Sequence, residues 1–258
     1  MSTAVDQQQL SDWTDAFARD GHICLPQFLA GDALEELQDN LARYIRDVVP
    51  GLPATHAFYE NREDPATLKQ MQYMQDEDSF FAELIRRDCF VDVAKSFLGE
   101  NVITQGAEYF NKPASLGKAT PPHQDGYYFC LVPNKAVTFW IALDNIDEEN
   151  GCLRYVTGSH NGGVRPHGAS QILGFSQGVQ DWGPADEARE MKYILQPGDV
   201  LVHHSLTIHR ADANTSNRSR RAMGLVYFAD SAQVDPTLQQ NYKDSLTNQH
   251  AGMGIATT

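Results

Sequence analysis

The stretch most suggestive of chemistry is residues 121–128 (PPHQDGYY), which offers an imidazole and a carboxylate two positions apart. On an extended strand, residues i and i+2 point to the same face, so His123 and Asp125 can bind one cation from one side while Gln124 points away. Two histidines and a carboxylate on one face of a metal, with the other positions open, form the ligand set of non-haem Fe(II) oxygenases. The stretch therefore predicts a metal site that needs one further histidine.

The pattern of residues leaves the third ligand open. Residues 197–209 predict two strands around a bend, and strand alternation lets any histidine of that segment face inward. The candidates are His160, His167, His203, His204 and His209. A centre with three protein ligands needs only one of them, so the others are expected to be core residues or to support the ligands.

Composition sets broad limits on the class of protein. At 258 residues, with 41% hydrophobic and 21% charged residues, the chain is expected to fold as a single domain, 1–258. The net charge is −14, and basic residues cluster only at 218–221, so a nucleic-acid partner is not expected. The four cysteines are scattered and are expected to be reduced.

The sequence also bears on location and partners. No apolar run approaches the roughly 20 residues that a membrane span requires. The N-terminus lacks the basic start and apolar core of a secretory signal, so we expect a cytoplasmic protein. Nothing in the sequence indicates an oligomeric state.

Two regions of different character are expected to position the metal site. Residues 1–100 are mostly helical in pattern, whereas residues 101–229 alternate short β-rich runs with Gly, Pro and Asn turns, which favours a sandwich or barrel. Helices are expected at 1–20, 31–48, 67–75 and 78–98, with a short strand at 21–26. Further strands are expected at 102–111, 126–132, 136–143, 153–157, 191–195, 199–204, 207–210 and 221–228. Residues 160–190 form a long insertion, and the tail from residue 230 is polar.

The chain resembles the phytanoyl-CoA dioxygenase family, whose members depend on Fe(II) and 2-oxoglutarate, from Phe17 to about Phe228. The motifs that carry the resemblance, in order, are 17–29 (FARDGHICLPQFL), 111–113 (NKP), 123–125 (HQD), 150–153 (NGCL), 157–160 (TGSH), 198–200 (GDV), 208–209 (IH) and 220–222 (RRA). The resemblance implies a mainly β fold with flanking helices, built on a double-stranded β-helix (jelly-roll, cupin-like) core at 101–229.

The resemblance also implies roles for individual residues. The metal ligands are expected to be His123, Asp125 and His209. Arg220 stands eleven residues after His209, where the family has the arginine that pairs with the far carboxylate of 2-oxoglutarate, and guanidinium suits a buried carboxylate. Trp140 corresponds to a tryptophan that lines the co-substrate site.

One position departs from the family pattern. The family often has a hydroxyl-bearing residue or glycine two positions after the distal histidine, and this chain has Ala211. We therefore expect another donor to the co-substrate, either Thr207 or a residue near Gln70 and Gln72.

Substrate contacts are expected beside the metal. Tyr127 and Tyr128 follow the carboxylate ligand and are the leading candidates for the pocket opening, with Asn111, and with His167 in the insertion. Tyr109 and Arg154 are weaker candidates.

The resulting hypothesis is a dioxygenase that uses Fe(II), 2-oxoglutarate and O₂ to hydroxylate a C–H bond of a small-molecule metabolite, releasing succinate and CO₂. Because Asp125 keeps the carboxylate ligand, halogenation is disfavoured. The alternatives are a non-catalytic cupin-like binding protein and a metal-dependent enzyme not linked to 2-oxoglutarate, such as a zinc hydrolase. The acidic chain favours a small cationic or neutral substrate over a CoA ester.

Overall fold

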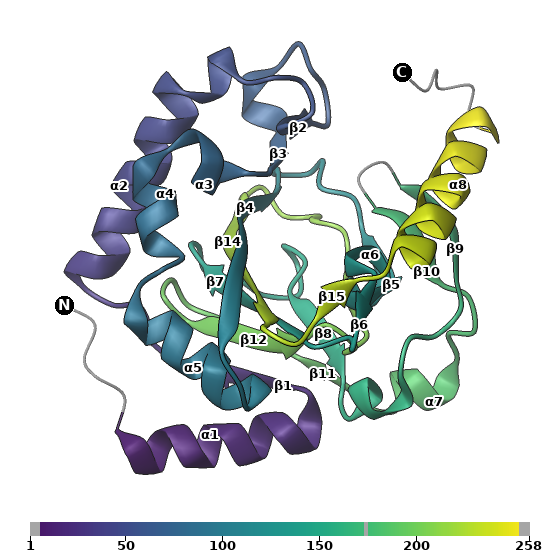
Figure 1. Cartoon of the computed structure of the whole chain (residues 1–258). Coiled ribbons are helices and arrows are strands. Elements are labelled where there is room, and N and C mark those ends of the chain that lie inside the picture. Colours follow the sequence, from purple (N-terminus) through teal and green to yellow (C-terminus); the bar gives the residue numbers. More distant parts are fainter. Residues whose placement is uncertain (1–5, 173–174, 253–258) are drawn as a thin grey trace.

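The computed structural model of the protein describes residues 6–172 and 175–252. Its centre is a seven-stranded sheet in the order β1-β12-β7-β14-β4-β3-β2, which faces a four-stranded sheet in the order β11-β8-β13-β5 (Figure 1). The large sheet consists of β1 (His22–Leu25), β2 (Ala57–Tyr59), β3 (Leu68–Met71), β4 (Val102–Lys112), β7 (Ala136–Ala142), β12 (Val200–His204) and β14 (Arg220–Ala229). The small sheet consists of β5 (Thr120–His123), β8 (Leu153–Val156), β11 (Glu190–Lys192) and β13 (His209–Ala211). All these pairings are antiparallel, so the expected mainly β class is confirmed.

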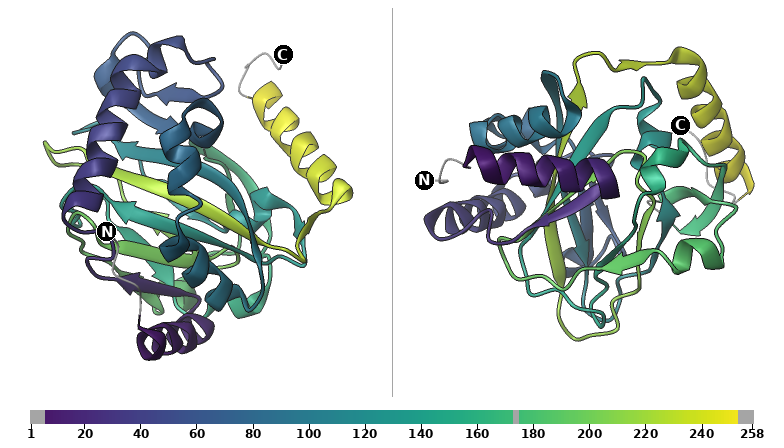
Figure 2. Two further views of the ribbon diagram at one scale, coloured as in Figure 1. Left: turned by 60° about the vertical axis from the view of Figure 1, so that its left-hand side comes forward. Right: turned by 90° about the horizontal axis from the view of Figure 1, so that it is seen from below.

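Helices from the first hundred residues cover the outer face of the large sheet. They are α1 (Gln7–Asp20), α2 (Asp32–Asp47), α3 (Met74–Glu77), α4 (Ser79–Leu84) and α5 (Asp88–Leu98), with short 3₁₀ turns at Val49–Gly51 and Pro65–Thr67. Figure 2 shows these helices on one side of the sheet and the C-terminal helix α8 (Pro236–Gly252) on the other.

Strand alternation divides the large sheet into two faces. Tyr109, Phe139, Val202 and Leu225 belong to the main core beneath the helices. Their neighbours Trp140, Ala142, Leu201 and Ala222 form a second apolar cluster on the inner face. Because side chains on a strand alternate with period two, the same strands fill the core on one side and line the interior of the barrel on the other.

Two segments differ from the sequence-based expectation. Residues 67–75, expected to be helical, form β3 and the one-turn helix α3, because Met71 and Gln70 pair with Tyr109 and Phe110 of β4. Residues 126–132, expected to be a strand, form α6 (Asp125–Phe129) and the two-residue strand β6 (Leu131–Val132).

The close approach of Gly126 to its neighbours explains the turn at α6. The backbone N–H of Gly126 donates to the carbonyl of Ser205 at 2.8 Å. A Cβ at this position would stand 2.4 Å from Oδ1 of Asn134, so a larger residue here would displace the Asn134 side chain.

The insertion and the tail contain more structure than their composition indicated. The insertion carries a hairpin of β9 (His167–Ile172) and β10 (Phe175–Val179), followed by α7 (Pro184–Glu187). The polar tail forms β15 (Gln233–Val234), which pairs with β6, and then the helix α8. Among the described helices, none is both long enough and apolar enough to cross a bilayer.

Candidate metal centre and its cavity

The three predicted ligands meet on the small sheet. His123 is the last residue of β5, His209 is the first residue of β13, and the two are directly paired across the strands. Asp125 is the first residue of α6, so the chain turns from strand into helix between the two ligands of the His-x-Asp pair. One potential ligand atom from each residue lies within 4.8 Å of the others. Nε2 of each histidine lies 3.6 Å from Oδ1 of Asp125.

Backbone carbonyls set the orientation of both imidazoles. Nδ1 of His123 lies 2.9 Å from the carbonyl of Pro121, and Nδ1 of His209 lies 3.0 Å from that of Thr207. Since a carbonyl only accepts, Nδ1 carries the proton and Nε2 keeps its lone pair for a metal. Burial lowers the pKa of both histidines, which favours the neutral ligand form.

The second carboxylate oxygen of Asp125 is held by two donors. Oγ1 of Thr138 donates to Oδ2 at 2.9 Å, and Nε2 of His203 lies 2.9 Å from the same atom. The hydroxyl of Tyr155 lies 3.0 Å from Nδ1 of His203. Burial alone would raise the pKa of Asp125, but His209, His203 and His123 outweigh it, and the pKa lies below the ordinary value. His203 therefore supports the metal ligand Asp125, which is one of the two roles expected for it, the other being a core residue.

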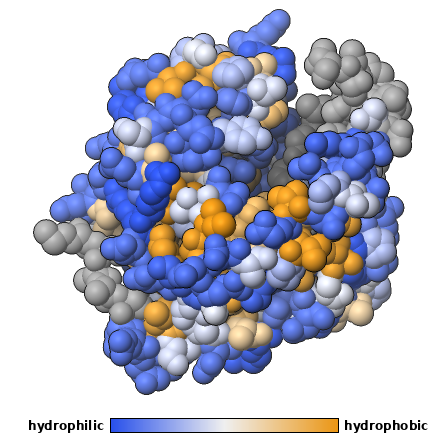
Figure 3. All heavy atoms as spheres, viewed as in Figure 1, coloured by the Kyte–Doolittle hydropathy of each residue, from blue (hydrophilic) through white to orange (hydrophobic). Residues whose placement is uncertain are grey.

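A cavity of about 370 Å³ opens above this centre. Figure 3 shows the surface hollowed between the part of the molecule that carries β2 and β3 and the side that carries α8. The wall comes from both sheets and both ends of the chain: Glu60, Lys69, Gln70, Gln72, Glu108, Phe110, Asn111, Lys112, Gly117, Lys118, Ala119, Thr120, His123, Asp125, Tyr128, Phe129, Thr138, Trp140, Leu153, His203, His209, Arg220, Val226 and Tyr242. The volume falls in the range typical of small-molecule sites.

Arg220 lies in the wall of this cavity, and no described residue forms an ion pair with it. It is 4% exposed, its Nε has no hydrogen-bond partner among the described residues, and its guanidinium lies 5.1 Å from the ring centre of Trp140. Burial lowers the pKa of Arg220 to about 10. Its neighbours Arg218 and Arg221 instead form ion pairs with aspartates. A buried guanidinium of this kind is suited to an anionic ligand.

Two residues beside Arg220 were not singled out in the sequence. Lys112 of β4 pairs with Arg220 in register, and its Nζ donates to the carbonyl of Lys118 and lies 3.4 Å from Oγ1 of Thr120. Thr120 stands directly opposite Ala211 across the β5–β13 pair. Lys112 belongs to the NKP motif and could have been found from it. Thr120 has no such signal, because only the strand register shows that it lies opposite Ala211, where relatives often have a hydroxyl.

Three predicted site residues lie outside the cavity wall, namely Thr207, Tyr127 and His167. The hydroxyl of Thr207 donates to the carbonyl of Gly21 at 2.7 Å. Tyr127 stacks on His167 with ring centres 4.2 Å apart. The remaining candidates, Tyr128, Asn111, Trp140 and Arg220, all line the cavity.

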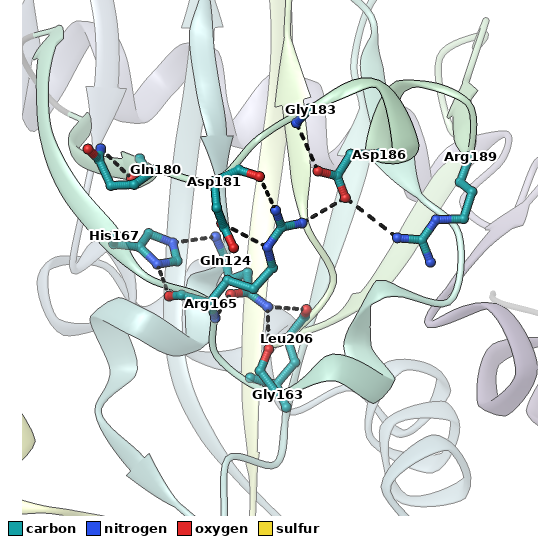
Figure 4. Close-up of polar contacts among 11 residues, drawn as sticks. Gln124, Gly163, Arg165, His167, Gln180, Asp181, Gly183, Asp186, Arg189 and Leu206 are labelled. Atoms are coloured by element: carbon teal, nitrogen blue, oxygen red, sulfur yellow. Dashed lines mark hydrogen bonds and ion pairs between the residues drawn. The ribbon is translucent and has the colours of Figure 1, made fainter.

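Figure 4 shows that both ring nitrogens of His167 contact backbone groups. Its Nδ1 lies 2.8 Å from the carbonyl of Arg165, and its Nε2 accepts from the backbone N–H of Gln124 at 3.2 Å. The Arg165 side chain pairs with Asp181 and Asp186, which ties this part of the insertion together. Burial lowers the pKa of His167 to about 4, so the ring is neutral and structural.

Gln124 points away from the metal ligands, as expected. Its amide nitrogen donates to the carbonyls of Gly163 and Leu206, and its oxygen accepts from the N–H of Arg165 (Figure 4). The residue between the two ligands therefore joins the insertion to the barrel.

The C-terminal helix contributes to the cavity. Tyr242 of α8 lines the wall and meets Tyr127 and Tyr128 edge to face, with ring centres 6.0 and 5.7 Å apart. The hydroxyl of Tyr128 donates to the carbonyl of Gln177 at 2.6 Å. The opening is thus bordered by α6, the insertion and α8.

Comparisons with known proteins agree with this geometry. Residues 17–222 match the family model described as phytanoyl-CoA dioxygenase (PhyH). The chain is 25% identical over 242 residues to the peroxisomal phytanoyl-CoA dioxygenase of Mus musculus, covering 87% of this chain and 71% of that protein. It is 32% identical over 195 residues to the Bos taurus enzyme, covering 70% and 56%. A probable alpha-ketoglutarate-dependent hypophosphite dioxygenase of Stutzerimonas stutzeri is 24% identical over 82% of this chain and 76% of its own length.

Solved structures share the fold. The epimerase SnoN in complex with Fe³⁺, alpha ketoglutarate and nogalamycin RO superposes with a TM-score of 0.72 at 22% identity, covering 90% of this chain and 88% of that one. EctD from S. alaskensis, with 2-oxoglutarate and 5-hydroxyectoine, gives 0.72 at 20% identity, covering 91% and 80%. The expected double-stranded β-helix is confirmed. Two neutral imidazole nitrogens and one carboxylate oxygen, with a buried arginine in the same cavity, fit iron and 2-oxoglutarate.

Proposed function

The chain belongs to the phytanoyl-CoA dioxygenase family, and from this premise we propose that it oxidises a C–H bond of a small molecule with Fe(II), 2-oxoglutarate and O₂. Succinate and CO₂ are the expected co-products, and hydroxylation is the expected outcome. His123, Asp125 and His209 would hold the iron, and Arg220 with Trp140 would hold the far carboxylate of 2-oxoglutarate.

The observation that carries the proposal is the unpaired guanidinium of Arg220 in the cavity that also contains the three ligands. A buried cation without a counter-charge is costly unless a ligand supplies one. A dicarboxylate that chelates the metal at one end and meets Arg220 at the other would supply it.

Bound iron supplies the activation of O₂ that is coupled to decarboxylation of 2-oxoglutarate and oxidation of the substrate. The protein positions the reactants and excludes water. His203 and Thr138 fix the carboxylate of Asp125 so that Oδ1 faces both imidazoles. The apolar side chains Phe110, Leu153 and Phe129 line the cavity and limit the water around the reacting groups.

Two other functions are less well supported. A zinc hydrolase can use two histidines and a carboxylate, but it has no need of a buried arginine opposite the metal. A cupin-like binding protein without activity has no need of the network that orients every ligand atom. Arg220 therefore favours the oxygenase over both alternatives.

The first test measures succinate formed from 2-oxoglutarate in the presence of Fe(II), ascorbate and O₂ without added substrate. We expect slow formation that disappears on chelation of the metal. Without O₂, the protein with Fe(II) and 2-oxoglutarate should show a visible charge-transfer band. Absence of both signals would overturn the proposed function.

A further inference from the structure

The part of β4 that lines the cavity has an acidic residue at one end and, at the other, a lysine beside Arg220. Glu108, Phe110 and Lys112 all line the cavity, as alternate residues of one strand should. Lys112 pairs in register with Arg220, and the guanidinium of Arg220 makes that end cationic. Glu108 is four residues away, about 13 Å along a strand. The far carboxylate of 2-oxoglutarate is expected at the Arg220 end of the cavity. The side chain of Glu108 lies in the other part of the cavity.

Glu108 has no cationic partner among the residues that the structure describes, unlike the other glutamate in the cavity. Oε1 of Glu60 lies 3.6 Å from Nζ of Lys69, and its Oε2 lies 3.9 Å from Nζ of Lys118. Burial raises the pKa of Glu108 to about 7, the negative charge of Asp125 adds to this effect, and a hydrogen bond with Gln70 opposes it. A carboxylate in such surroundings is costly unless a ligand brings positive charge.

Aromatic side chains surround the same space. Phe110, Tyr128, Phe129 and Tyr242 line the cavity together with Glu108. Aromatic faces attract cations through their quadrupole, and the chain's net charge of −14 adds a general attraction for cations. A carboxylate among aromatic rings is suited to an ammonium or guanidinium group.

We infer that Glu108 anchors a positively charged group of the substrate, so that the cavity takes an organic cation, either an amine or a guanidine in its protonated form. This inference rests on the proposed function and names the substrate class of the same site. Glu108 pairs with Gly224 and thereby shares a row of the sheet with Trp140. The next row on that face contains Val226 and Thr138, and Thr138 donates to Asp125. A cation bound at Glu108 thus places the rest of the substrate beside the metal.

The test uses the full chain loaded with Zn(II), which is diamagnetic, and 2-oxoglutarate. Saturation-transfer NMR measures the affinity for two matched pairs of probes: n-butylguanidinium with n-butylurea, and choline with 3,3-dimethylbutan-1-ol. Each pair has nearly the same shape and differs in charge. We expect each cation to bind at least about tenfold more tightly than its neutral partner, as for a charge-assisted contact.

The variants are Glu108→Gln, which keeps the shape of the side chain, and Glu83→Gln, which removes an exposed carboxylate of α4 outside the cavity. The preference for cations should disappear in the first and persist in the second. Thermal unfolding checks that both variants are folded.

Two results would overturn the inference: equal binding of cation and neutral probe by the native protein, or an unchanged preference in Glu108→Gln. A Glu108 that merely bonds Gln70 in its neutral form would give the first result. Succinate formation is measured on the same preparations loaded with Fe(II). If it is absent, the proposed function fails, while the probe affinities still decide the role of Glu108.

Discussion

Nε2 of His203 lies 2.9 Å from Oδ2 of Asp125, the carboxylate oxygen turned away from the two ligand histidines. The hydroxyl of Tyr155 lies 3.0 Å from the opposite ring nitrogen, so it can donate there and leave the proton on Nε2. A tyrosine, a histidine and a carboxylate thus form one chain of hydrogen bonds that ends at a metal ligand. Such contacts orient a ligand without touching the metal.

Replacing His203 with Leu should weaken binding of a divalent metal by roughly 10- to 100-fold, because Asp125 loses one of the two donors to Oδ2. Thr138→Val removes the other donor while keeping its shape, and it should cause a loss of similar kind. The measurement is a metal titration of the metal-free protein with Co(II), followed by its absorbance. Unchanged affinity in both variants would mean that the bonds to Oδ2 do not matter for the metal.

Replacing Arg220 with Ala should raise the concentration of 2-oxoglutarate needed for half-maximal succinate formation by roughly 100-fold, because a buried carboxylate loses its charged partner. Arg218→Ala is the matched control, since Arg218 pairs with Asp147 at the surface. If Arg220→Ala needs the same 2-oxoglutarate concentration as the native protein, the co-substrate does not bind at Arg220.

Thr120 is expected to supply the hydroxyl that Ala211 lacks. Its oxygen lies 3.4 Å from Nζ of Lys112 and can accept from it, which leaves the hydroxyl hydrogen for a ligand. Thr120→Val should raise the 2-oxoglutarate requirement roughly tenfold, the effect of one lost bond to a charged group.

The strand register offers a rescue of this variant. Because residues 120 and 211 are directly opposed, adding Ala211→Ser to Thr120→Val should restore much of the native requirement. Failure of the second change to help would indicate that the hydroxyl of Thr120 acts through packing alone.

Binding of 2-oxoglutarate should be accompanied by proton uptake near pH 8. Burial, with the charge of Arg220, lowers the pKa of Lys112 to about 6, so the amine is neutral at pH 8 before binding. A dianion beside it raises that pKa, and the site gains a proton. At pH 5.5, below that pKa, most of the amine is already protonated, so the uptake should be much smaller than at pH 8.

Calorimetry in buffers of different ionisation enthalpy measures the number of protons taken up. The contribution should be lost in Lys112→Met, which separates it from any proton taken up by Glu108. A native protein that takes up no proton at pH 8 would contradict this account, even if the variant did not fold.

The sequence predicted the metal ligands better than the backbone conformation around them. His123 and Asp125 follow from a local motif, His209 and Arg220 were implied by the family resemblance, and the structure brings all four to one cavity. The turn between His123 and Asp125 was not predicted, because it depends on contacts of Gly126 with Asn134 and with Ser205, which lies far along the chain. A strand was expected there from the apolar and aromatic residues that follow.

Which of the expected substrate residues line the cavity could not be predicted, because the polarity of a residue does not reveal the direction of its side chain. His167 has the type of a binding residue, yet both its ring nitrogens contact backbone groups. Glu108 lies in a strand that the sequence did predict, and its proposed role depends on the lack of a cationic partner among the described residues. Only the pairing of β3, β4 and β14 determines which side chains share its space.

The helix α8 lies beyond residue 222, where the match to the family ends, yet its Tyr242 forms part of the cavity wall. The strands that hold the metal ligands are fixed by inter-strand hydrogen bonds, whereas this helix packs onto the barrel through its side chains. Exchanging the tail between relatives would therefore change which molecules are admitted without disturbing the chemistry beneath. We therefore expect substrate selectivity to depend in part on a segment outside the strands that carry the metal ligands.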